Sequence, residues 1–151
     1  MEERILSLAS DEFGRTMEIH LEMEDDCALL EIKTREQDVF QHSERIIHGG
    51  WVLSMAQFLG PWGVPGDLES REPVCRRFVG PRLGIGITPI SAEHLWLHIY
   101  FILPKPCCDN VEHNPEFVMG VTREDMAKLG LFFTDAACGL FMEDLQHASD
   151  A

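Results

Sequence analysis

The sequence predicts an α+β fold: a two-layer domain with an antiparallel sheet of about five or six strands, one long C-terminal helix and one short helix. Three observations lead to this prediction. Several short segments alternate apolar and polar residues, as strands with one buried face do. Two other segments space their apolar residues three and four positions apart, as amphipathic helices do. The length of 151 residues, 45% of them hydrophobic and 25% charged, suits a single domain over 1–151.

The chain begins with a predicted hairpin. Residues 16–23 alternate between apolar and polar side chains, and residues 28–33 do so again after a turn at Asp25 and Asp26. Residues 5–9 fit either a preceding strand or a short helical turn, and residues 39–48 fit a third strand. This part of the chain therefore predicts strands with an acidic outer face.

A short helix is predicted over 51–59, because its apolar residues share one stripe. The stripe consists of Val52, Met55, Ala56 and Leu59. Gly60 and Pro61 are expected to end this helix. The following segment, 61–81, is rich in glycine, proline and charged residues, so it is predicted to be mostly a long surface loop.

The second half contains the strongest strand pattern in the chain. Residues 83–87 alternate apolar residues with glycines, and after a turn over 91–94 the strict alternation of 95–103 has an aromatic second face. Thr122 and the acids that follow it predict a capped helix start, and an apolar stripe extends this helix over 122–145. The stripe consists of Met126, Leu129, Phe133, Ala137, Leu140, Phe141 and Leu145.

Charge is the unusual feature of the composition. The chain has 26 Asp and Glu against 12 Lys and Arg, for a formal net charge of −14. Such a charge repels nucleic-acid phosphates and anionic lipids and attracts basic surfaces, although an ordinary acidic soluble domain would also have it. We therefore expect a protein partner, with no direct binding of nucleic acid or membrane. The oligomeric state stays open.

The cellular compartment is predicted from three features. No segment approaches the ~18–20 apolar residues that cross a bilayer. The N-terminus carries acids where a secretory signal would carry basic residues before an apolar run. The five cysteines are odd in number, and Cys107 and Cys108 are adjacent, which does not suit a disulfide framework. These features predict a cytoplasmic protein with reduced thiols.

Motifs for catalysis and cofactor binding are weak. Cys107, Cys108 and His113 are close in sequence, but adjacent cysteines do not readily reach one tetrahedral site and no C-x-x-C pair accompanies them. His94 and His98 share one strand face. Nucleophile motifs and phosphate-binding loops are absent from the sequence, although a Cys–His pair that meets only in space stays open. We therefore predict no catalytic residues, no metal site and no cofactor.

Seven acids fall on or near the N-terminal hairpin and are the candidate partner-binding residues. One interpretation is a solvated face, and the other is a negative patch that steers a basic partner towards the molecule. The seven are Asp11, Glu12, Glu18, Glu22, Glu24, Asp25 and Asp26.

Residues His48-Gly49-Gly50 precede the short helix and follow a hairpin. Over 16–50 this arrangement resembles the entrance to the central helix of hotdog-fold thioesterases. The resemblance implies hydrolysis of acyl thioesters, but the helix offers only Ser54 and Gln57 to activate water. A Gly-Gly turn before a helix is the alternative interpretation of the motif.

The order of elements over most of the chain resembles a second family. A meander leads through Glu-Arg-Ile-Ile-His-Gly-Gly-Trp at 44–51 into the short helix. A hairpin spans 84–101, and a strand runs through Gly-Val-Thr-Arg-Glu-Asp-Met at 120–126 into the closing helix. This layout is similar to that of the small α/β immunity proteins that bacteria carry beside polymorphic toxins, and it departs from them in 61–81.

The second resemblance implies a non-catalytic inhibitor that neutralises a toxin with a basic surface. We take this function as the leading hypothesis. Two alternatives remain: a hotdog-like acyl thioesterase, and a phage-encoded acidic nucleic-acid mimic that acts against a host defence complex.

Overall fold

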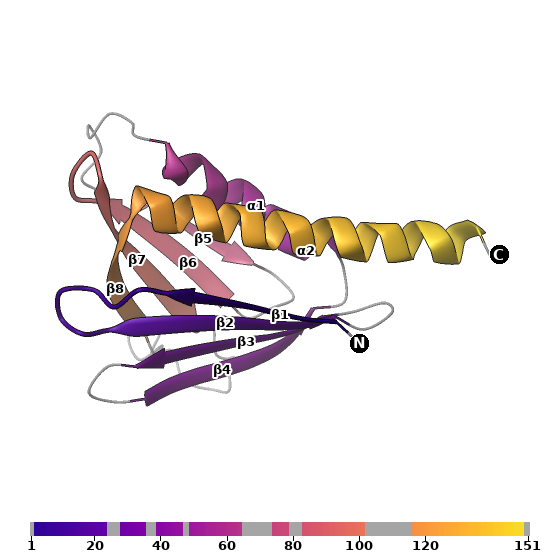
Figure 1. The fold of residues 1–151 in the computed structure, drawn as a ribbon, viewed down its shortest axis with the longest axis horizontal. Helices are drawn as coiled ribbons and strands as arrows, with labels where there is room; N and C mark the ends of the chain where they lie inside the picture. The colour runs from indigo at the N-terminus through magenta and orange to yellow at the C-terminus, as the bar shows by residue number, and fades with distance from the viewer. Residues whose placement is uncertain are drawn as a thin grey trace, which may run out of the picture.

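A computed structural model of the chain describes residues 2–23, 28–35, 39–46, 49–64, 74–78, 83–101 and 116–149. Within these residues, two four-stranded antiparallel sheets and two α-helices form (Figure 1). The first half contains β1 (Glu2–Leu8), β2 (Thr16–Met23), β3 (Ala28–Arg35), β4 (Val39–Ile46), α1 (Gly49–Leu59) and the 3₁₀-helix η1 (Gly60–Gly63). The second half contains β5 (Val74–Phe78), β6 (Leu83–Pro89), β7 (His94–Phe101), β8 (Glu116–Thr122) and α2 (Arg123–Ser149).

The α+β class is confirmed, but the prediction of one sheet of five or six strands is wrong. The strands form a β1-β2-β3-β4 sheet and a β5-β6-β7-β8 sheet, and each is a meander in sequence order. Alternation in the sequence reveals which face of a strand is buried, but it does not reveal where one sheet ends and another begins. Here the chain passes through α1 and η1 between β4 and β5, and β5 pairs with β6.

The predicted hairpin is confirmed, and its apolar face is buried. Residues 17, 19, 21 and 23 of β2 and residues 28, 30 and 32 of β3 are all buried, and the residues between them are more exposed. In the segment 5–9, left open between a strand and a helical turn, residues 5–8 belong to the strand β1, all seven residues of which pair with β2. Residues 39–46 form the strand β4, as the pattern at 39–48 allowed.

The second sheet contains the two strands predicted most strongly from the second half of the sequence, as β6 and β7. Leu95, Leu97 and Ile99 of β7 are buried, and Trp96 and His98 on the other face are half-buried. The prediction of a mostly irregular loop over 61–81 is wrong in two places, because η1 continues directly from α1 and β5 pairs with β6. Glycine and proline content therefore concealed a short edge strand.

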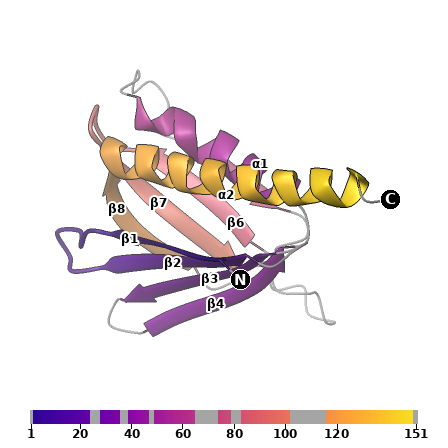
Figure 2. The same ribbon diagram turned by 45° about the vertical axis from the view of Figure 1, so that its right-hand side comes forward.

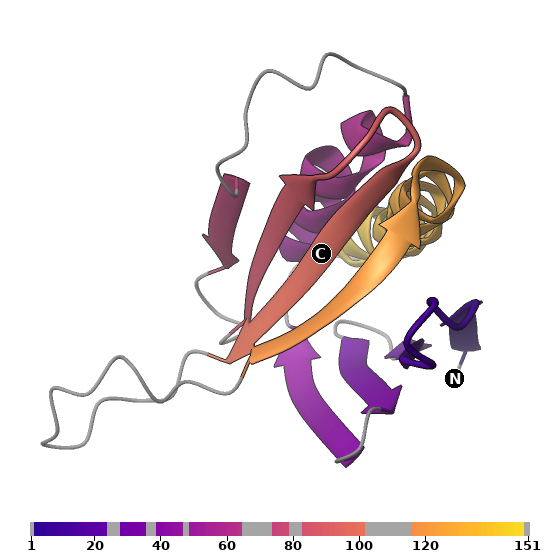
Figure 3. The same ribbon diagram turned by 90° about the vertical axis from the view of Figure 1, so that its left-hand side faces the viewer.

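Both predicted helices form, and they lie side by side with the sheets against them (Figures 1 and 3). The stripe predicted for α1 is buried along its whole length. In α2 the stripe from Met126 to Ala137 is buried, and the side chains of the later stripe residues lie outside the described part. The C-terminal turns of α2 extend past α1 and past the sheets (Figures 1 and 2).

Small residues allow α2 to approach η1 closely. A Cβ atom added to Gly130 of α2 would lie 2.7 Å from the Cα atom of Gly60, closer than real Cβ atoms approach backbone. A Cβ atom at Gly63 would lie 2.9 Å from the Cα atom of Ala127. Glycine at these positions is therefore a requirement of packing.

The two sheets and the two helices share one core. Side chains from β2, β3, α1, β6, β7 and α2 line a small cavity of about 10 Å³, at the lower limit of the space that a water molecule needs. Each sheet therefore buries its apolar face against elements from both halves of the chain. Within the described residues, no helix is long and apolar enough to cross a membrane.

Candidate functional site

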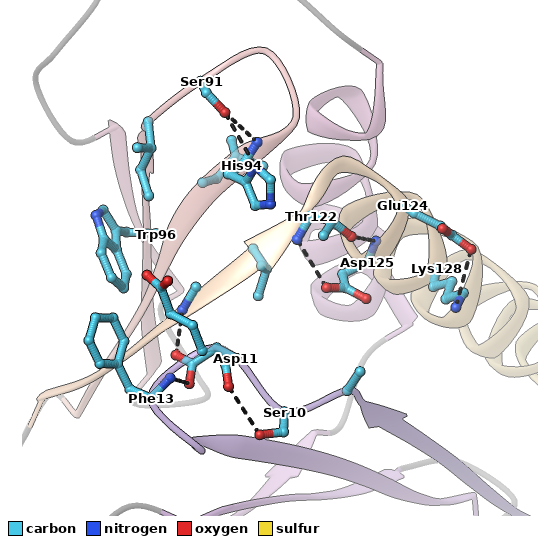
Figure 4. Close-up of a pocket in the computed structure, with 16 residues that line it drawn as sticks. Ser10, Asp11, Phe13, Ser91, His94, Trp96, Thr122, Glu124, Asp125 and Lys128 are labelled. Carbon is cyan, nitrogen blue, oxygen red and sulfur yellow. Dashed lines mark hydrogen bonds and ion pairs between the residues drawn. The ribbon is translucent and has the colours of Figure 1, made fainter.

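A groove of about 640 Å³ lies where the two halves of the molecule meet. Three segments form its walls: the β1–β2 loop (9–13), the β6–β7 turn with the start of β7 (90–96), and the end of β8 with the first turns of α2 (120–128) (Figure 4). These segments are far apart in sequence. The fold, and not any local motif, therefore creates the groove.

The groove combines exposed apolar side chains with carboxylates. Phe13 is 65% exposed and Ile90 is 48% exposed, although both are large apolar residues. Glu12 is exposed on the loop, and the side chain of Glu124 is 79% exposed on α2. In Figure 4, Phe13 and Trp96 lie together at one side of the groove, and Glu124 and Lys128 lie at the other.

Asp11 holds the β1–β2 loop in place. Its Oδ1 accepts hydrogen bonds from the backbone N–H of Phe13 (3.0 Å) and of Arg15 (2.9 Å). Its Oδ2 accepts from Arg15 Nε (2.8 Å) and from the backbone N–H of Gly120 on β8 (3.0 Å). Only 4% of the Asp11 side chain is exposed. This carboxylate therefore ties the loop of the first sheet to the edge of the second.

The environment of Asp11 favours its charged form. Burial acts to raise the pKa of this carboxyl, but the hydrogen bonds from the backbone of Gly120 and Arg15, together with the Arg15 guanidinium, outweigh that effect. The pKa of Asp11 therefore lies below its ordinary value of 3.8. Asp11 is ionised at neutral pH and acts as a fixed structural anion.

Aromatic rings and Arg15 complete the contact between the loop and β7. Phe13 and Trp96 stack with 6.3 Å between ring centroids and 24° between ring planes. The Arg15 guanidinium carbon lies 4.8 Å from the centroid of Phe13 and 5.3 Å from that of Trp96. Such cation–π contacts hold the rings in one position. The exposed Phe13 is therefore held in place before any partner binds.

The start of α2 forms the opposite wall and is itself rigid. Thr122 Oγ1 accepts a hydrogen bond from the Asp125 backbone N–H (3.1 Å), and Asp125 Oδ2 accepts one from the Thr122 N–H (3.0 Å). This reciprocal arrangement is the predicted capping box. The buried Arg123 guanidinium donates to the backbone oxygens of Ala92 (3.1 Å) and Trp62 (3.1 Å). Arg123 therefore fixes the β6–β7 turn and η1 to the helix start.

The seven acids that the sequence singled out do not form one patch. Asp11 is buried in the loop contact, and Glu12 lines the groove. Glu18 and Glu22 lie on the outer face of β2, a strand that spans roughly 23 Å. Glu24, Asp25 and Asp26 lie outside the described residues. The loop acids are thus at one end of β2, and Glu22 is near the other.

Bases accompany the acids on the outer face of β2. His20 is in contact with Glu18 on its own strand and lies 3.5 Å from a Glu3 carboxylate oxygen on β1. On β3, Lys33 Nζ lies 3.2 Å from a Glu31 carboxylate oxygen. This face is therefore a mixed-charge surface and not a uniformly negative one.

One side-chain pair in the groove carries groups that can exchange a proton. Ser91 Oγ lies 3.4 Å from His94 Nδ1 and accepts hydrogen bonds from the backbone N–H groups of Glu93 (3.4 Å) and His94 (3.1 Å). These bonds make a turn around the serine oxygen.

His48 and the thiols Cys107 and Cys108 lie outside the described residues, and the Cys138 thiol on α2 is free and exposed. Among described side chains, no cluster of His, Cys, Asp or Glu is arranged to hold a metal ion.

Sequence reasoning missed the apolar members of the groove. Phe13 and Ile90 sit in turns, and a single apolar residue in a turn does not differ from an incidental exposed one. A usable signal was Gly120, opposite Trp96 in the β7–β8 register, because a glycine in a strand marks close approach of another group. Here that group is the Asp11 carboxylate.

No protein-family model matches this sequence, and a search of the curated proteins finds no similar one. The groove and the surface charge are the features that bear on function.

Proposed function

We propose that this chain is a cytoplasmic, non-catalytic acidic binding protein that neutralises a macromolecular partner, acting as an immunity-type inhibitor of a toxin with a basic surface. One observation carries the proposal: the rigid groove exposes Phe13 and Ile90 beside the carboxylates of Glu12 and Glu124. Exposed apolar side chains rimmed by charges are typical of protein–protein interfaces. The net charge of −14 favours a basic partner.

The rigidity of the groove walls supports a role in binding a partner. The loop is held by Asp11 and Arg15, and the helix start is held by the capping box and by Arg123. A surface that is already ordered loses less conformational entropy when a partner binds. Tight neutralisation of a partner benefits from this property.

The thioesterase alternative has less support. A hotdog fold has one sheet wrapped around one central helix, whereas here two four-stranded sheets share two adjacent helices. Purified protein is expected not to hydrolyse acyl thioesters. Hydrolysis that disappears in the His48→Ala variant would favour the enzyme over the inhibitor.

The proposal is tested by recovering a partner and measuring its kinetics. Tagged protein is used to capture partners from the native cell, and the partner is then purified separately. We expect a basic protein whose association rate falls at least tenfold between low salt and 1 M salt, where the Debye length is only about 3 Å. A partner that is acidic, or one that binds at the same rate at every salt concentration, would contradict the proposal.

A further inference from the structure

We infer that the groove at the junction of the two sheets, rather than the outer face of β2, is the contact surface, and that its occupant is an extended segment of a second protein with an arginine or lysine beside an apolar side chain. This inference rests on the proposed function, because it specifies the partner's chemistry at the same site.

The charges that line the groove are unbalanced. Four acids line it, Asp11, Glu12, Glu124 and Asp125, against one lysine, Lys128, and one imidazole, that of His94. Asp11 and Asp125 are occupied by hydrogen bonds within the protein, so Glu12 and Glu124 are the carboxylates that face solvent. Lys128 lies 3.5 Å from Glu124, but both side chains are more than half exposed and such a pair is weak. A cationic side chain is therefore the complementary group.

The apolar part of the groove requires a second kind of contact. Phe13 and Ile90 expose large apolar surfaces, and the buried residues Leu95 and Val121 also line the groove. Removing such surface from water stabilises a complex by roughly 25 cal/mol per Å². A free amino acid or a bare cation would leave this apolar surface exposed to water. A peptide segment with neighbouring basic and apolar side chains satisfies both parts of the groove.

The loop that carries Glu12 and Phe13 is preorganised for this contact. Asp11 accepts hydrogen bonds from the backbone N–H groups of Phe13 and Arg15 and from that of Gly120 on β8. The Arg15 guanidinium lies over the rings of Phe13 and Trp96. Asp11 is thus a positioning residue: it does not face the occupant but sets where Phe13 and Glu12 stand. Substitution of Asp11 is therefore expected to weaken binding without removing a direct contact.

A second copy of this chain is a poor occupant. Each copy carries a net charge of −14, so docking one groove against another copy would bring like charges together. The groove itself contributes an excess of acids to that repulsion. A basic segment of a different protein is not repelled by these charges.

The occupant class is tested with two small probes. The capped tripeptides Ac-Leu-Arg-Leu-NH₂ and Ac-Leu-Glu-Leu-NH₂ are titrated into ¹⁵N-labelled full-length protein, and amide shifts are followed by NMR. We expect saturable shifts at Phe13, Ile90 and Thr122 with the arginine peptide and at least tenfold weaker binding of the glutamate peptide. Equal responses to both peptides, shifts confined to β2, or no shifts at millimolar peptide would overturn the inference. Concentration-dependent shifts of these amides without peptide would identify a second copy instead and overturn it too.

The contact surface is tested with charge-matched variants. Glu12→Lys/Glu124→Lys changes two groove carboxylates, and Glu18→Lys/Glu22→Lys makes the same change in net charge on the outer face of β2. We expect the groove variant to weaken binding of the arginine peptide at least tenfold and the β2 variant to change it less than twofold. Ile90→Ala against Ile5→Ala, a residue 54% exposed on β1, tests the apolar contact in the same way. The reverse pattern in either pair would overturn the inference.

The two proposals fail in different ways. If a captured basic protein binds with salt-sensitive kinetics but responds only to the β2 variant, the inhibitor function stands and the groove is wrong. If the arginine peptide occupies the groove but the captured partner is not basic, the inhibitor function is wrong. Circular dichroism of each variant confirms that folding is unchanged before binding is compared.

Discussion

Two acid–base contacts built from similar residues differ sharply in their surroundings. At the loop contact, Asp11 and Arg15 are 4% and 14% exposed, and the carboxylate also accepts three backbone hydrogen bonds. On the outer face of β2, Glu18 is 45% exposed and its partner is the neighbouring His20. The difference teaches that the role of an acid here is set by the backbone groups that surround it, and not by its charge or its neighbours in sequence.

The largest expected effect is on the loop contact. Asp11→Ala leaves the Arg15 guanidinium without its carboxylate and removes the acceptor of three N–H groups, so the free energy of unfolding should fall by about 3–5 kcal/mol. Glu18→Ala, the control, should change it by less than about 0.5 kcal/mol because the Glu18 side chain is 45% exposed and keeps its contact with water. Urea denaturation at pH 7 measures both. Similar effects for the two variants would show that the comparison is mistaken.

A second contrast, between a position too close to its neighbours for a side chain and one with ordinary room, concerns two glycines of α2. An added methyl group at Gly130 meets the backbone of η1, whereas at Gly139 its nearest neighbours are 3.7 Å away, in ordinary contact. Gly130→Ala should therefore destabilise the protein by roughly 1–3 kcal/mol. Gly139→Ala should stabilise it by about 0.5–1 kcal/mol, as alanine does in a helix interior.

Thermal unfolding of the two glycine variants measures the difference. The melting temperature should fall for Gly130→Ala and rise for Gly139→Ala. A rise for both would mean that η1 moves aside at little cost.

A smaller effect is expected from pH, because it removes only the charge of Asp11. The pKa of this carboxyl is lower in the folded protein than the ordinary value of 3.8, so its ionised form stabilises the fold above that value. That contribution is lost as the pH falls through the folded pKa. The difference in unfolding free energy between wild type and Asp11→Asn should therefore be constant near neutral pH and shrink below about pH 4. If the difference in unfolding free energy grew as the pH fell, the lowered pKa of Asp11 would be contradicted.

The smallest effect concerns the outer face of β2 and salt. The Glu18 side chain is 45% exposed, so salt screens the interactions of its charge, and the small cost of Glu18→Ala should shrink in 1 M salt. The cost of Asp11→Ala should persist, because hydrogen bonds to backbone N–H groups in a buried site are screened far less. Urea denaturation in both salts measures the two costs. Loss of both in salt would show that the Asp11 contact is merely electrostatic and exposed.

The sequence predicted local structure well, because periodicity reports burial directly. The alternation in β2, β3 and β7 and the stripe of α1 all match buried positions. The division into two sheets was not predictable in this way, since pairing is a property of the whole chain. The short strand β5 was obscured by the glycines and prolines around it.

The candidate site was only partly predictable. Glu12 was singled out and lines the groove, but Phe13, Ile90 and Trp96 were not connected to it. Asp11 was singled out for its charge, although its carboxylate is buried. A sequence cannot distinguish Asp11 from Glu12, since the N–H of Gly120 that decides between them is 109 residues away.

The strand β8 is the last strand of its sheet among the described residues, so within them one side of its backbone has no neighbouring strand. Two N–H groups on that side, those of Gly120 and Thr122, donate to the carboxylates of Asp11 and Asp125. An open edge normally offers such groups to a strand from another molecule, which is a common route to aggregation. Here two side-chain carboxylates already occupy the C-terminal end of the edge. The loop contact thus also guards the protein against assembling with itself strand by strand when its concentration in the cell rises.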